Sequence, residues 1–210
     1  MVEYKTIRLQ ASDEFVERRS RFIGHAKPVK TEEDAISFLN EMRQKYWDAS
    51  HNTYAYLLRD SGIQRYSDDG EPQGTAGIPI LEVLTKAGLT DAVIVVTRYF
   101  GGTLLGKGGL LRAYSHSASI AVKKAQVLTM RQCLLAELCC DYSQYGKIVS
   151  LIPDCGGVLD ETEFTDTVRL GFHITDTDMN KFQKELTEAT SGQIAAKITG
   201  EKFFEFLQDS

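Results

Sequence analysis

Apolar positions in the first half of the chain recur with spacings that predict both helices and strands. Residues 32–47 are expected to form an amphipathic helix, because their apolar positions have helical spacing: Ala35, Leu39, Met42 and Tyr46. Thr31 stands before three acidic residues, which is typical of a helix N-cap and a favourable first turn. The uninterrupted apolar run at residues 92–96 predicts a fully buried strand. A helix lined with small side chains is expected from about residue 110 to residue 125.

Strand and helix patterns start again near Arg131, which predicts a second unit. Six elements are expected there, in the order β-α-β-β-α-β: 134–140, 145–152, 157–164, 168–174, 179–189 and 194–198. His173 falls among the polar positions of its alternating strand and is expected to face solvent. We therefore expect an α+β chain with domains at residues 1–130 and 131–210, each with its helices on one face of a sheet.

Formal charge is distributed unevenly between these two expected domains. The chain of 210 residues has a net charge of −5. Residues 1–130 contain 17 basic and 15 acidic side chains, whereas residues 131–210 contain 7 and 14. A polyanion such as nucleic acid is therefore expected to meet only the first domain.

The cysteines, the N-terminal sequence and the lengths of the apolar runs all bear on cellular location. The four cysteines contain no C-x-x-C pair and cluster in one stretch, which suits buried thiols in a reducing compartment. The N-terminal sequence lacks the apolar stretch of a secretory signal. No apolar run approaches the roughly 20 residues that span a bilayer. We expect a cytoplasmic protein with no membrane partner.

A glycine-rich segment follows the buried strand and resembles part of a phosphate-binding P-loop. Gly101, Gly106 and Lys107 match the G-x-x-x-x-G-K pattern between a strand and a helix. The next position is Gly108, whereas a P-loop requires a serine or threonine there to bind Mg²⁺. The segment could still hold an anion on backbone amides, with Lys107 as a point charge. The alternative is that its glycines only form a tight turn.

Three carboxylates stand close together between residues 67 and 77. Asp68, Asp69 and Glu71 could hold Mg²⁺ or another divalent cation, because hard cations prefer oxygen ligands. Their spacing is not that of a calcium-binding EF-hand loop, and aspartates are also frequent turn formers. Apart from this candidate metal, no cofactor is expected.

Basic and aromatic residues near the strand ends and the glycine segment form the candidate surface for a phosphate or nucleic acid. Its members are Arg21, Arg98, Tyr99, Gly101, Gly102, Gly106, Lys107, Gly108 and Arg112. Arginine side chains combined with aromatic rings are typical of proteins that bind single-stranded RNA. The alternative is that half of the tyrosines in this region are core residues and the arginines are solvated.

Two long motifs resemble the signatures of the YigZ/IMPACT family. The first runs from Ser67 to Gly77 and includes Gly70, Pro72, Gly74, Thr75, Ala76 and Gly77. The second runs from Val95 to Gly102 and continues through Leu105-Gly106 to Arg112 and Tyr114. The segment around His51 and Tyr54 is similar to a weaker upstream motif of the family. The resemblance covers about residues 1–128, and the remainder is similar to the small domain that bacterial members append.

This resemblance implies a fold and a function class. The first domain is expected to have the ribosomal-protein-like fold with a left-handed βαβ unit, as in translation factors. The second is expected to be ferredoxin-like, similar to the last domain of the ribosomal translocase. The implied function is that of a translation-associated regulator, more a binding protein than an enzyme. It would contact RNA, ribosomal components or protein partners as a monomer or weak homo-oligomer.

An enzymatic alternative stays open on the same residues. A metal-assisted hydrolase or phosphotransferase would combine Asp68, Asp69 and Glu71 with the segment Gly101–Gly109. The enzyme hypothesis gains if the acidic and glycine-rich segments face one shared pocket, and loses if they lie on separate surfaces.

Overall fold

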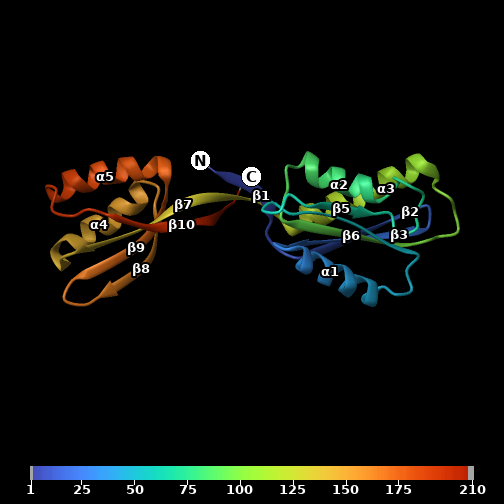
Figure 1. The fold of residues 1–210 in the computed structure, drawn as a ribbon, viewed down its shortest axis with the longest axis horizontal. Coiled ribbons are helices and arrows are strands. Elements are labelled where there is room, and N and C mark those ends of the chain that lie inside the picture. Colours follow the sequence, from blue (N-terminus) through green and yellow to red (C-terminus); the bar gives the residue numbers. More distant parts are fainter. Residues whose placement is uncertain (1, 208–210) are drawn as a thin grey trace. The chain divides into compact units, whose positions relative to one another are not determined.

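The computed structural model describes residues 2–207, which form two compact units (Figure 1). The N-terminal unit contains Tyr4–Thr129 together with Leu207, and the C-terminal unit contains Met130–Phe206 together with residues 2 and 3. Both contain helices and antiparallel strands, so the two-domain α+β class expected from the sequence is confirmed. No helix within residues 2–207 is both long enough and apolar enough to cross a lipid bilayer.

The N-terminal unit is built on a five-stranded sheet in the order β2-β3-β6-β4-β5. Its strands are β2 (Ala11–Glu17), β3 (Ser20–Pro28), β4 (His51–Leu57), β5 (Gln64–Ser67) and β6 (Ala92–Tyr99). All neighbours in this sheet are antiparallel. The central strand β6 is buried from Ala92 to Arg98, as its apolar run predicts. Strand β2 was not predicted, because polar residues predominate in it and the sequence shows no apolar strand pattern there.

Helices cover both faces of this sheet (Figure 1). The three helices are α1 (Glu32–Lys45), α2 (Gly77–Lys86) and α3 (Gly106–Ala125). The side chains of α1 share a core with Val93 and Val95, whereas α2 and α3 share another with Ile94 and Val96. Successive side chains of a strand point to opposite faces, so the apolar run of β6 contributes to both cores. The expectation of helices on one face is therefore wrong for this unit.

The ends of the helices differ in how far the sequence predicts them. Thr31 caps α1 by accepting a hydrogen bond from the backbone amide of Asp34 at 3.1 Å, as expected. α3 begins at Gly106, whereas the sequence predicts a start near residue 110. The prediction is late because the first turn is glycine-rich, which is typical of a loop. Further along α3, a Cβ on Gly24 of β3 would lie 2.3 Å from the carbonyl oxygen of Ser117. Only glycine allows β3 and α3 to approach so closely.

The C-terminal unit has the expected element order β-α-β-β-α-β. Its elements are β7 (Val127–Cys140), α4 (Tyr142–Asp154), β8 (Val158–Phe164), β9 (Val168–Thr175), α5 (Asp176–Thr190) and β10 (Lys197–Leu207). Within this unit β7 pairs with β9, β9 with β8, and β10 also with β7, and a further strand of the chain, β1, is Glu3–Ile7. Both helices lie on one face and share one core with β7 and β9 (Figure 1).

His173 of β9 is buried, so the expectation that it faces solvent is wrong. Its Nδ1 lies 2.8 Å from a carboxylate oxygen of Asp160. The ring of Phe204 in β10 stacks on the imidazole with a centroid distance of 3.6 Å. The alternating sequence of β9 contains no information about Phe204, which covers His173 from another strand.

Candidate functional site

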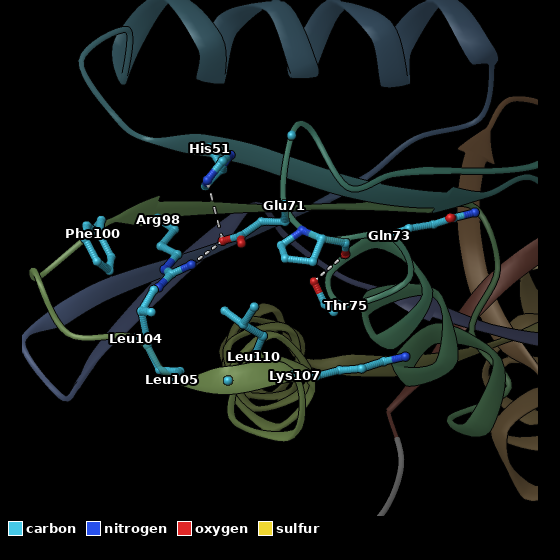
Figure 2. A pocket seen from close by; sticks show the side chains of 13 residues that line it. His51, Glu71, Gln73, Thr75, Arg98, Phe100, Leu104, Leu105, Lys107 and Leu110 are labelled. Carbon is cyan, nitrogen blue, oxygen red and sulfur yellow. Dashed lines mark hydrogen bonds and ion pairs between the residues drawn. The ribbon is translucent and has the colours of Figure 1, made fainter.

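The acidic and glycine-rich segments line one cavity of the N-terminal unit, with a volume of about 560 Å³. Its lining comes from residues 70–75, from residues 98–110 and from His51 on β4 (Figure 2). We call it the signature cavity, because both sequence motifs contribute to it. The first turn of α3 and the loop after β6 close one side, and the loop before α2 closes the other.

Glu71 is the central polar group of the signature cavity. Its Oε1 accepts a hydrogen bond from Arg98 at 2.5 Å and another from the Tyr114 hydroxyl at 2.6 Å. His51 Nε2 lies 3.8 Å from the same oxygen (Figure 2). Burial, followed by the hydrogen bond to Glu71, raises the pKa of Tyr114 well above its usual range. Tyr114 therefore stays protonated and donates to the carboxylate.

Arg98 lies inside the unit and has only 5% of its surface exposed. Its guanidinium lies over the rings of Phe22 and Phe100, at 5.3 and 5.5 Å from their centroids. One terminal nitrogen pairs with Glu71, while Nε has no hydrogen-bond partner among the described residues. The charge of Arg98 is thus balanced by a neighbouring carboxylate, unlike that of a surface arginine free to bind phosphate.

The other two carboxylates of the acidic segment hold backbone in place. The Asp68 carboxylate accepts hydrogen bonds from the amides of Gly74, Ala76 and Gly77, at 2.8, 3.0 and 2.9 Å. Asp69 accepts from the amide of Asn52 at 2.6 Å. Within residues 2–207 we find no group of three histidine, cysteine, aspartate or glutamate side chains placed to hold a metal ion.

His51 is oriented by the same segment. Its Nδ1 lies 2.7 Å from the backbone carbonyl oxygen of Asp69. A carbonyl oxygen only accepts, so Nδ1 carries the proton and donates it. In the neutral imidazole the lone pair of Nε2 is then left on the side where Glu71 lies.

The first turn of α3 brings positive charge to the signature cavity. Gly106 and Lys107 line it, and no side chain caps the amides of this turn. Lys107 and Arg112 have no ion-pair partner among the residues that the structure describes. α3 contains no aspartate or glutamate along its whole length. Arg112 lines a neighbouring cavity of about 310 Å³ between α3 and β2.

Other expected site residues lie outside the signature cavity. Arg21 is exposed and paired with Glu14 at 2.5 Å, and the Tyr99 hydroxyl donates to Asp48 at 2.8 Å. Gly101 packs against the turn between β2 and β3, where a Cβ would lie 2.1 Å from the carbonyl carbon of Arg19. Gly102 and Gly108 are exposed and do not line it.

Sequence reasoning missed the apolar wall of the signature cavity. This wall consists of Phe100, Leu104, Leu105 and Leu110. Phe100 and Leu104 are 49% and 81% exposed, which is unusual for large apolar side chains. Their position inside a glycine-rich segment was the available signal, because a pure turn would need neither residue.

Two domain families match the chain in the expected order. The Impact N-terminal domain matches residues 18–122, and a domain of unknown function, DUF1949, matches residues 138–193. Both signature motifs fall within the first match.

Relatives match nearly the whole chain. "IMPACT family member YvyE" from Bacillus subtilis is 38% identical over 90% of this chain and 88% of its own length. "IMPACT family member YigZ" from Escherichia coli is 34% identical over 84% and 88%. A solved structure titled "Crystal structure of an hypothetical protein" aligns with a TM-score of 0.60 and 28% identity, covering 94% of this chain and 98% of its own. The chain therefore belongs to the IMPACT family.

Proposed function

We propose that this chain is a cytoplasmic, translation-associated binding protein whose N-terminal unit contacts RNA at the signature cavity. The observation that carries the proposal is the first turn of α3. It brings an uncapped helix N-terminus and the unpaired Lys107 to a cavity whose buried carboxylate is already balanced by Arg98. Helix N-termini and lysine side chains both favour phosphate groups.

The charge of α3 supports an extended polyanion in preference to a single small anion. Arg112 follows Lys107 by five residues along α3 and lines the neighbouring cavity, and the helix contains no acidic side chain. Phe100 and Leu104 stand exposed at the other side and offer apolar surface for unstacked bases.

The architecture is compatible with this role. We assign the C-terminal unit to the ferredoxin-like fold on its β-α-β-β-α-β order. We assign the N-terminal unit to the ribosomal-protein-like fold that the family resemblance implies. Both folds occur in proteins of the translation apparatus, which is why we place the RNA partner there.

The enzyme hypothesis gains from the shared cavity but loses from the positions of the carboxylates. The acidic and glycine-rich segments do share a cavity, as a metal-assisted hydrolase or phosphotransferase would need. Of the three carboxylates, however, only Glu71 lines it, and Asp68 and Asp69 accept from backbone amides. We therefore propose binding in preference to hydrolysis.

Fluorescence anisotropy with a labelled single-stranded RNA of roughly ten nucleotides would test the proposal. We expect Lys107→Ala with Arg112→Ala to weaken binding and to reduce the slope of log affinity against log salt by about 0.7 per lost contact. Lys123→Ala with Lys124→Ala is the matched control, because it removes two charges from the other end of α3. The proposal fails if RNA does not bind at low salt, or if both double variants have the same effect.

A further inference from the structure

We infer that the signature cavity recognises a ribonucleotide through its 2′-hydroxyl group, and so selects RNA over DNA. This inference rests on the proposed function and names the chemical feature of the ligand that the cavity reads. It follows from the separation of hydrogen-bond acceptors, hydrogen-bond donors and apolar surface around the cavity (Figure 2).

The acceptors lie together where β4 and the acidic segment meet the cavity. In its neutral form the imidazole of His51 presents the Nε2 lone pair there, because Nδ1 donates to the carbonyl of Asp69. Glu71 Oε1 already accepts from Arg98 and Tyr114, whereas its Oε2 has no hydrogen-bond partner among the described residues. A ligand that enters here must therefore bring a donor, such as a hydroxyl or amino group.

The donors lie on the opposite side of the cavity, on α3. The first-turn amides have no side-chain cap, and Lys107 extends from this turn away from Phe100 (Figure 2). This side favours an anionic group. The apolar wall around Phe100 and Leu104 forms a third side, suited to a flat ring.

A ribonucleotide carries three groups that match these three sides. Its phosphate suits the first turn of α3, its base suits Phe100 and Leu104, and its 2′-hydroxyl lies between them on the sugar. That hydroxyl can donate to Glu71 or His51. The cavity volume of about 560 Å³ lies within the range of roughly 300–1,000 Å³ that is typical of small-molecule sites. Deoxyribose lacks the 2′-hydroxyl, which is the group that distinguishes RNA from DNA.

The inference is tested by measuring the affinity of the unsubstituted full chain for three labelled probes of one sequence: RNA, DNA and 2′-O-methyl RNA. The methylated probe keeps the sugar oxygen but has no hydrogen to donate. A hydrogen bond to a charged group corresponds to about tenfold or more in affinity. We therefore expect RNA to bind about tenfold more tightly than either other probe.

Two variants locate the selectivity. His51→Phe removes one acceptor and should bring the affinities for RNA and DNA closer together. Lys107→Ala should weaken all three probes alike, because phosphate contacts do not depend on the 2′-hydroxyl. Far-ultraviolet circular dichroism and a thermal melt verify that each variant is folded, and His51→Gln replaces His51→Phe if the latter is not.

The possible outcomes separate this inference from the proposed function. Equal affinity for RNA, DNA and 2′-O-methyl RNA, with all three weakened by Lys107→Ala, would overturn the 2′-hydroxyl inference and leave RNA binding standing. A preference for RNA over DNA that 2′-O-methyl RNA shares would also overturn it, because the methylated probe has no hydrogen to donate to Glu71 or His51. No binding of any probe at low salt would overturn the proposed function itself.

Discussion

Arg98 and Glu71 form an ion pair inside the N-terminal unit, with only 6% and 3% of their side-chain surfaces exposed. Removing one partner of such a pair leaves a buried charge without compensation. We expect Arg98→Ala to lower the free energy of unfolding by about 3–5 kcal/mol in urea titrations. Exposed Arg112→Ala is the control and should change it by no more than about 0.5 kcal/mol. A small effect of Arg98→Ala would mean that Glu71 is protonated or solvated in the fold.

Arg98 also shows what charge patterns along a sequence do and do not predict. Sequence placed Arg98, Lys107 and Arg112 near one another, and two of them do line the signature cavity. It could not show that Glu71, 27 positions earlier, balances Arg98. Ion pairing across a fold depends on tertiary contacts, which local spacing does not contain.

Asp68 is expected to contribute to stability through three backbone hydrogen bonds. Asp68→Ala leaves the amides of Gly74, Ala76 and Gly77 without this acceptor, at the start of α2. We expect a loss of at least about 2 kcal/mol in the free energy of unfolding, because hydrogen bonds to a charged group are stronger than neutral ones. Exposed Asp60→Ala should have little effect. A stability gain from Mg²⁺ that Asp68→Ala abolishes would contradict this structural role and favour a metal site.

His25 makes stability depend on pH. Burial, followed by the charge of Lys45, lowers the pKa of His25 from 6.5 to about 4. The unfolded chain therefore binds a proton at a higher pH than the folded chain does, so stability is complete above about pH 6.5 and falls as pH decreases towards 4. The total loss is about 3 kcal/mol. The unfolding free energies of the unsubstituted protein and of His25→Gln, measured between pH 7 and pH 4, should converge as pH falls.

At the scale of elements, the loop between β6 and α3 depends on two glycines for different reasons. A Cβ at Gly101 would lie 2.1 Å from the backbone of Arg19, whereas a Cβ at Gly102 would meet nothing within 4 Å. Gly102 instead has a φ of +79°, which costs a non-glycine residue about 1 kcal/mol. We expect Gly101→Ala to destabilise the unit more than Gly102→Ala and to weaken the proposed RNA binding, because it displaces Phe100 and Leu104.

Thermal melts and anisotropy on the two alanine variants would measure both effects. Equal melting temperatures would show that the turn between β2 and β3 moves aside for the new methyl group. Unchanged RNA affinity in a folded Gly101→Ala variant would show that the loop carries no part of the binding surface.

The elements differ in how well the sequence predicted them. Helix α1 was predicted through a periodic apolar stripe and a capping threonine, and the order of elements in the C-terminal unit through alternating strand patterns. Strand β2 was missed, and α3 was expected to start four residues too late. The two failures have different causes. Polar residues predominate in β2, which is held by pairing with β3, whereas the first turn of α3 is rich in glycine, a residue typical of turns.

At the scale of the whole molecule, the two units have separate hydrophobic cores and different balances of basic and acidic side chains. The core of the C-terminal unit contains Phe172, Phe182 and Leu186, and none of its members belongs to the cores of the N-terminal unit. Residues 131–210 contain 7 basic and 14 acidic side chains, an excess that is expected to repel nucleic acid. Every residue that lines the signature cavity lies within Tyr4–Thr129. The stability of the C-terminal unit and the proposed RNA affinity should therefore be separable by substitution.

Leu186→Ala tests this separation, because Leu186 is fully buried in the core of the C-terminal unit. Deleting a buried leucine side chain costs about 2–5 kcal/mol. Calorimetry should show that the transition of the C-terminal unit moves to lower temperature while that of the N-terminal unit stays in place. Leu84→Ala, on the buried face of α2 in the core of the N-terminal unit, should move the other transition. At a temperature where both variants are folded, Leu186→Ala should leave RNA affinity unchanged. A single transition that both substitutions shift equally would mean that the two units unfold together. A loss of RNA affinity in the folded Leu186→Ala variant would place part of the proposed binding surface on the C-terminal unit.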